Sequence, residues 1–258
     1  MEELILVLKF YLLMAVRVSA IIILFPGFGS TGFPAIAKIF IIGAISLVVM
    51  MGTPAVVAPI LSDNVMFSVF VVKEAFIGFF IGFFSQFPFM AVRAAGDIVS
   101  FNTMFSMANV IDPSMQQQVT VWGEFYNIMA MLIFFSMNGH LIILKAIVFS
   151  FRKISVLDPV VFNQAVLSSV TGTAGAIFMA GVLIAAPVAV TLFMSNVSMG
   201  VVSRTMPQFN VFMVGIPLQI MLAFVLIIVT IPMDSELVRN LMGRMFAEIN
   251  GLLAAFAR

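Results

Sequence analysis

The sequence contains no cysteine, which excludes disulfide bonds, Cys-ligated zinc sites and Cys nucleophiles. Its single histidine, His140, excludes a cluster of His ligands within one chain. No Ser, Asp or Glu lies at a spacing typical of a catalytic triad or of an intramembrane protease dyad. We therefore expect no enzyme activity, no bound metal and no cofactor.

Charge is scarce as well. Only 9% of the 258 residues are charged, against about 25% in a soluble domain. Hydrophobic residues make up 63% of the chain, and the mean hydropathy is +1.22. Such a chain cannot supply the polar surface that a water-soluble protein needs, so we predict an integral membrane protein. The formal net charge of +1 gives no reason to expect a nucleic-acid partner.

Long apolar runs are what the sequence does have. Six of them approach the ~20 residues that a helix needs to cross the hydrocarbon core, at 4–25, 39–61, 67–90, 122–144, 174–202 and 211–233. Backbone groups in lipid must be satisfied internally, which favours helices. We predict a single all-α membrane domain over 1–258, with Pro88, Pro187 and Pro217 as candidate kinks. The charge-free stretch 159–203 fits one tilted span or a helical hairpin.

The C-terminal residues 234–258 differ from the rest. Apolar residues recur there at helical spacing, with charged residues between them, which predicts an amphipathic tail helix. It could lie on the membrane surface, dock on a partner or fold back on its own bundle. On a six-span reading, Lys and Arg divide seven to three between the two sides of the membrane, which places both termini in the cytoplasm.

Several ionisable side chains stand in or near apolar segments: Arg17, Lys73, Glu74, Glu124 and Lys145. Such charges usually face a bundle interior or a water-filled path. Structural pairs with other helices or subunits are the favoured interpretation, and an ion relay is the alternative. Adjacent helical residues point about 100° apart, so we expect Lys73 and Glu74 not to pair with each other. His140, at the end of an apolar run, is expected to cap or hydrogen-bond rather than catalyse.

The segment 93–118 is predicted to be a loop with polar ends and an apolar, Met-bearing centre. Asp112 and Pro113 favour a turn within it. Methionine adapts to irregular gaps, which suits a surface that must seal and re-form. Composition alone favours the alternative, a re-entrant or surface loop with no gating role.

Three motifs resemble the flagellar biosynthetic protein FliR family, and the resemblance covers essentially the whole chain. They are Phe-Ser-Met-Ala at 105–108 with the Asp-Pro and glutamines that follow, Phe-Phe-Ser-Met-Asn-Gly-His-Leu at 134–141, and Arg-Thr-Met-Pro-Gln-Phe-Asn-Val-Phe at 204–212 followed by Gly-Ile-Pro-Leu-Gln. The sequence departs from the family pattern at Ser100 and Met104, where glycines are expected, and at Asn102 and Gln219, where Gln and a basic residue are common.

The resemblance implies a subunit of the flagellar type III export gate in the bacterial inner membrane, at the flagellar basal body. It implies kinked helical hairpins assembled with FliP-like and FliQ-like subunits in a closed ring, with an FlhB-like subunit attached. Apolar segments would then be covered partly by protein and partly by membrane lipid. The cargo would be unfolded export substrates.

The resemblance also implies roles for particular residues. A channel plug would be formed by Phe105, Met107, Asn109, Val110, Ile111, Asp112, Pro113 and Met115. Subunit contacts or buried polar positions would be held by Arg17, Lys73, Glu74, Glu124, His140, Lys145, Arg204, Gln208 and Asn210. The plug would close the pore at rest and be displaced by cargo.

Two other classes of function remain as alternatives. The homologous subunit of a virulence injectisome would share the fold and mechanism but export effectors. An independent secondary transporter would use Arg17, Lys73 and Glu74 as a relay, and such folds usually show internal repeats. We find no convincing repeat in the sequence.

Overall fold

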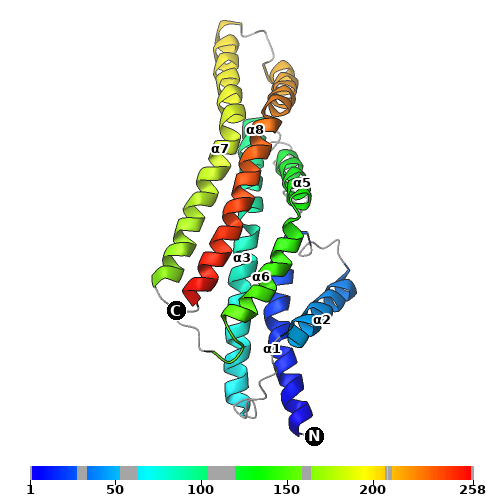
Figure 1. The fold of residues 1–258 in the computed structure, drawn as a ribbon. Coiled ribbons are helices and arrows are strands. Elements are labelled where there is room, and N and C mark those ends of the chain that lie inside the picture. The colour runs from blue at the N-terminus through cyan, green and yellow to red at the C-terminus, as the bar shows by residue number, and fades with distance from the viewer. Residues whose placement is uncertain are drawn as a thin grey trace. The chain divides into compact units, whose positions relative to one another are not determined.

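The computed structural model describes residues 2–27, 34–52, 63–103, 120–158, 164–206, 208 and 211–256. Within these residues the chain forms helices and no strand, which confirms the all-α prediction (Figure 1). The helices are α1 (Glu2–Leu24), α2 (Ala35–Gly52), α3 (Asn64–Asn102), α5 (Val121–Ser136), α6 (Gly139–Lys153), α7 (Gln164–Thr205) and α8 (Val211–Phe256).

Five of the described helices, α1, α2, α3, α7 and α8, are each long and apolar enough to cross a membrane. Together α5 and α6 could provide a sixth span, broken by a 69° bend. The prediction of an integral membrane protein with about six hydrophobic helical segments is therefore confirmed.

The bend between α5 and α6 corrects the expectation of one apolar segment over 122–144. Asn138 adopts the left-handed conformation, with φ 56° and ψ 32°, and separates the two helices. Asparagine tolerates this conformation better than most residues. The N–H of Met137 closes the end of α5 on the carbonyl of Ile133 at 3.0 Å. Gly139 then begins α6.

Three helices are longer than the apolar runs that predicted them. Residues 93–102, expected in a loop, form the last turns of α3, so that part of the loop prediction is wrong. The stretch 159–203 contains no helical hairpin over its described residues, because α7 runs unbroken from Gln164 to Thr205. The amphipathic stretch continues α8 without a break as far as Phe256. Prolines lie inside all three helices, where other parts of the protein can compensate for the missing donor.

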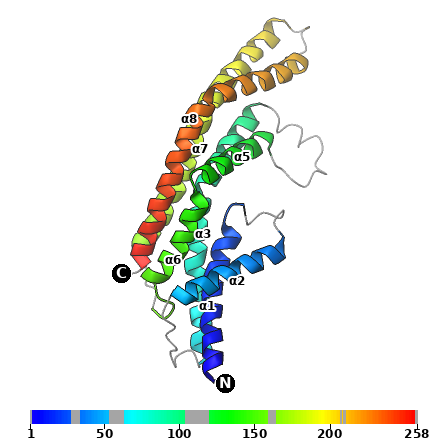
Figure 2. The same ribbon diagram turned by 45° about the vertical axis from the view of Figure 1, so that its right-hand side comes forward.

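The chain divides into two compact units, which we describe separately. The first consists of Met1–Phe87, Asn138–Gly172 and Gly243–Arg258. In it α2 lies against α1 (Figure 2), where the Tyr11 hydroxyl donates to the carbonyl of Gly43 at 3.3 Å. The core of this unit contains fully buried aliphatic side chains from α1 and α3, including Leu13, Met14, Ile21, Ile77 and Ile81.

A close approach of α1 and α3 fixes this core. A Cβ atom on Gly78 would lie 2.5 Å from the Arg17 carbonyl oxygen and 2.7 Å from Ala20 Cβ. Only a glycine lets the two backbones come this near without displacement. The Gln86 side-chain amide donates to the carbonyl of Leu24, at the last residue of α1. The first unit is therefore built on backbone proximity as well as apolar burial.

The end of α8 packs on its own chain. Met245, Ile249, Leu252 and Phe256 are at most 2% exposed, and the Phe256 ring lies 5.9 Å from the Phe80 ring. Arg244 and Glu248, on the opposite face, are exposed. Of the alternatives for the amphipathic stretch, the structure shows its apolar face folded back on the bundle.

The second unit consists of Pro88–Met137 and Thr173–Met242. Aromatic pairs join its helices. The ring centres of Trp122 in α5 and Phe224 in α8 are 4.8 Å apart, and those of Phe89 in α3 and Phe134 in α5 are 5.6 Å apart. A Cβ atom on Gly181 of α7 would lie 3.0 Å from the carbonyl oxygen of Ala91, so α3 and α7 are also closely packed.

Candidate functional site

A buried ion pair joins α1 to α3 in the first unit. Arg17 and Glu74 are both 0% exposed. The Arg17 Nε lies 2.5 Å from Glu74 Oε2, and its Nη2 lies 2.9 Å from Oε1, which is a bidentate pair. The guanidinium also donates to the Ile154 carbonyl at 3.1 Å and lies 4.1 Å from the centre of the Phe151 ring. The desolvated charge of Arg17 is thus compensated by a carboxylate, a carbonyl and an aromatic face.

Lys73 extends this cluster beyond the end of α6. Its ammonium donates to the backbone carbonyls of Ser155, Val156 and Asp158 at 3.2, 2.5 and 3.0 Å. Carbonyls that follow a helix C-terminus lack intrahelical donors, and cations there oppose the helix dipole. Lys73 and Arg17 together therefore hold the turn after α6 against α1 and α3.

One detail of this cluster differs from the sequence expectation. Lys73 Nζ lies 3.0 Å from Glu74 Oε1, so the adjacent residues do pair. The four-carbon lysine stem bends far enough to overcome the ~100° between the two side-chain directions. Apart from this pair within α3, the polar contacts of the cluster described above hold one helix to another or to the turn, so the geometry favours structural pairing over an ion relay.

The expected plug residues, Phe105, Met107, Asn109, Val110, Ile111, Asp112, Pro113 and Met115, lie outside the described residues. So does Met104. The structure does describe where the segment 104–119 leaves α3 and where it joins α5. Both attachment points belong to the second unit.

The last turns of α3 and the start of α5 are held together. The Thr120 hydroxyl hydrogen-bonds the Asp97 carboxylate, and its oxygen accepts the Gly123 N–H at 3.2 Å as the N-cap of α5. A Cβ atom on Gly96 would lie 2.5 Å from Gly123 Cα. We name these contacts of Gly96, Asp97, Thr120 and Gly123 the segment base.

A polar chain across α3, α7 and α8 lies at the C-terminal end of α3. The Asn196 side-chain amide donates to the Asn102 carbonyl at 3.3 Å, and the Gln219 amide donates to Asn196 Oδ1. Gln219 is 2% exposed, so the position where the family often has a basic residue here holds a buried neutral amide. Sequence reasoning missed Asn196, although an amide in a charge-free apolar helix was the available signal.

Asp234 is a second residue that sequence reasoning missed. The sequence pattern places it at the start of the amphipathic tail, but it is 0% exposed inside α8. Its Oδ2 accepts from the Thr230 hydroxyl at 2.9 Å and lies 3.3 Å from the Tyr126 hydroxyl of α5. An acid between apolar residues of a membrane helix was the signal for such a buried polar contact.

The exposure of the other predicted positions varies. Glu124, Lys145, Arg204 and Gln208 are exposed, and His140 is half-buried. Asn210 lies outside the described residues.

The glycines of the segment base give a direct test of its packing. Gly96→Ala should destabilise the detergent-solubilised protein by about 1–3 kcal/mol, because the added methyl group has no space. The matched change Gly175→Ala, at an exposed position of α7 where an added methyl group would meet nothing within 4 Å, should stabilise by up to ~1 kcal/mol. Chemical unfolding in mixed micelles measures both variants. Equal effects of the same sign would contradict the close approach.

The sequence is similar to a known protein family and to several proteins of known name. Residues 8–245 match the family described as bacterial export proteins, family 1. The flagellar biosynthetic protein FliR of Bacillus subtilis (strain 168) is 33% identical over 95% of this chain and 94% of its own length. FliR of Escherichia coli (strain K12) is 28% identical over 96% and 92%, and FliR of Aquifex aeolicus (strain VF5) is 28% identical over 87% and 86%. With a family match that spans both units and relatives covered nearly end to end, this chain belongs to the flagellar biosynthetic protein FliR family of bacterial export proteins.

Proposed function

We propose that this chain is a subunit of the flagellar type III protein export gate, in the bacterial inner membrane at the flagellar basal body. It assembles there with FliP-like and FliQ-like chains, and an FlhB-like chain associates with them. The observation that carries the proposal is the match to bacterial export proteins over residues 8–245. The flagellar names of the relatives favour this gate over that of a virulence injectisome.

The exposed apolar side chains are compatible with an assembly in a membrane. On α3, Val65 and Phe101 are 71% and 77% exposed; on α7, Leu167 and Val201 are 64% and 60% exposed. Apolar surface of this kind is stable only when lipid or other protein chains cover it.

The proposed mechanism is passive gating. The segment 104–119 blocks the channel at rest, with Met107, Val110, Ile111 and Met115 as its apolar seal, and an unfolded rod, hook or filament subunit displaces it. The segment base supports this role because it joins the last turns of α3 to the start of α5, the two helices between which the segment lies in the sequence. The sequence has no Gly-x-x-x-x-Gly-Lys-Ser/Thr phosphate-binding loop, so the energy for transport comes from elsewhere in the apparatus.

Native mass spectrometry tests the assembly. The full chain is co-expressed with its FliP-like and FliQ-like neighbours, extracted in detergent and weighed as intact complexes. We expect a hetero-oligomer of defined stoichiometry that contains all three chains. A monomer or homo-oligomer, with both neighbours present but unbound, would refute the gate assignment and favour a free-standing transporter.

A further inference from the structure

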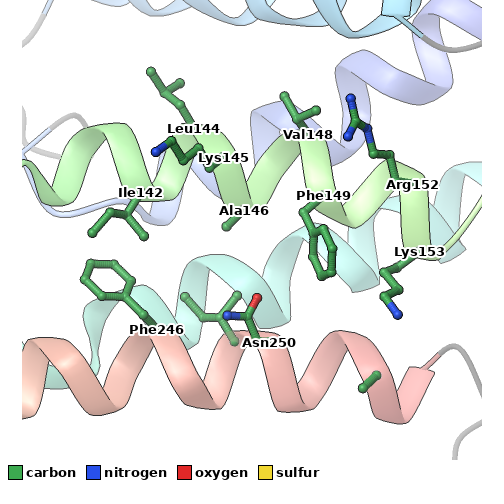
Figure 3. A pocket seen from close by; sticks show the side chains of 12 residues that line it. Ile142, Leu144, Lys145, Ala146, Val148, Phe149, Arg152, Lys153, Phe246 and Asn250 are labelled. Carbon is green, nitrogen blue, oxygen red and sulfur yellow. The ribbon is translucent and has the colours of Figure 1, made fainter.

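A groove of about 820 Å³ lies between α6 and the C-terminal part of α8, inside the first unit. Figure 3 shows Ile142 and Phe149 of α6 directed toward α8, and Phe246 directed toward α6. Asn250 lies between them on α8. The volume is in the range of small-ligand sites, about 300–1,000 Å³, and the walls are mainly apolar. We name this feature the α6–α8 groove.

The charge of the groove has one sign. Lys145, Arg152 and Lys153 line it, and no acidic residue does. Figure 3 shows Lys153 extended toward α8, Arg152 on the side of α6 away from α8, and Lys145 farther along α6, beside Leu144. All three are exposed. Among the residues that the structure describes, none of the three forms an ion pair.

Other cations already bind the backbone carbonyls that follow α6. Arg17 and Lys73 already donate to the carbonyls that follow the helix, from Ile154 to Asp158. Lys153 also lies 5.6 Å from the centre of the Phe149 ring, at the apolar wall of the groove. A ligand that satisfies both features has an anionic head group for the cations and a hydrocarbon part for the apolar wall.

We propose that the α6–α8 groove binds an anionic phospholipid. Its phosphate lies at Lys153, while Lys145 and Arg152 add to the positive potential around α6, and an acyl chain lies along Phe149 and Phe246. Basic pockets between membrane helices favour such head groups, and long cationic side chains reach them from apolar surroundings. The neighbouring α6 side chains Leu144 and Val148 are 40% and 38% exposed, so a lipid can enter from the surrounding apolar phase.

The test compares lipid head groups on the full-length protein. Phosphatidylglycerol and phosphatidylcholine with identical acyl chains are titrated into the detergent-solubilised chain, and bound lipid is counted by native mass spectrometry. We expect phosphatidylglycerol to bind about tenfold more tightly, in line with several surface cations acting on one anionic head group. Equal affinity for the two lipids would overturn the proposal.

Charge variants locate the site. The triple variant Lys145→Gln, Arg152→Gln, Lys153→Gln should abolish the preference for phosphatidylglycerol. The matched control Arg93→Gln, Arg204→Gln, Arg239→Gln removes three exposed cations of the second unit and should keep the preference. The same loss in both variants would show a nonspecific effect of net charge and refute the site.

A filling variant tests the groove itself without altering charge. Ala254 is an exposed groove residue, so Ala254→Trp can occupy the acyl-chain space without disturbing the core. It should weaken phosphatidylglycerol binding while thermal unfolding stays unchanged. The measurement is repeated on the co-purified hetero-oligomer. Two results together would assign the groove to an acidic partner helix instead: the wild-type hetero-oligomer binds no lipid, and the hetero-oligomer that contains the triple charge variant loses a partner chain.

Discussion

Glu74→Ala should destabilise the folded chain by about 3–5 kcal/mol, because it leaves the Arg17 guanidinium buried without its carboxylate. Both side chains are fully buried, so water cannot replace the lost partner. The change also removes the anion that lies 3.0 Å from Lys73. Denaturant titration of the protein in mixed micelles, followed by circular dichroism, measures the loss. The same variant should assemble poorly in cells.

Two further variants separate this mechanism from a general effect of charge removal. Glu124 is exposed on α5, so Glu124→Ala should change stability by less than ~0.5 kcal/mol. The double variant Arg17→Met, Glu74→Met removes both buried charges and should recover much of the loss, as apolar replacements of buried pairs often do. If Glu74→Ala behaved like Glu124→Ala, the ion pair would not be a structural anchor.

Deleting residues 107–115 should raise the leakage of small solutes through the assembled gate several-fold. The deletion removes all four side chains of the proposed apolar seal, and hydrated ions cross a pore once its apolar constriction is lost. Solute or ion flux into cells or proteoliposomes that contain the complete complex measures the effect. Unchanged leakage would refute the plug assignment.

Length-preserving variants refine this prediction. Replacing Met107, Val110, Ile111 and Met115 by Ser should raise leakage although the segment keeps its length. Replacing the glutamines at 116–118 by Ser should not, because they are no part of the seal. Equal leakage in the two variants would mean that the apolar side chains do not form the barrier.

The helices were predictable because length and hydropathy act locally, but their ends were not. Asn138 and Gly139 lie inside an apolar run that predicts one continuous helix. The Asn-Gly pair was the available signal for the break between α5 and α6. At Arg93 and Asp97 the expectation is wrong in the opposite direction. Their charges favour a loop, although α3 continues to Asn102. A helix that packs on other helices can carry polar residues on one face, so local polarity does not end it.

The buried charges were predictable as a class, but their partners were not. That Arg17 and Glu74 would need compensation follows from the cost of charge in apolar surroundings. Their pairing, across 57 positions of sequence, depends on how near Gly78 lets α1 approach α3. Tyr126 and Asp234 likewise meet only because α5 packs on α8. Such contacts are properties of tertiary packing, which one sequence without its relatives does not reveal.

The segment base sets a limit on distance. Asp97 and Thr120 are hydrogen-bonded, and 16 residues separate Thr103, just after α3, from Thr120, just before α5. At ~3.3–3.6 Å per residue, half of this stretch spans at most about 25–30 Å. Half the length of this stretch is therefore comparable to the thickness of a bilayer core. In the proposed gating mechanism, the contact between Asp97 and Thr120 returns the segment to the same place after each cargo has displaced it.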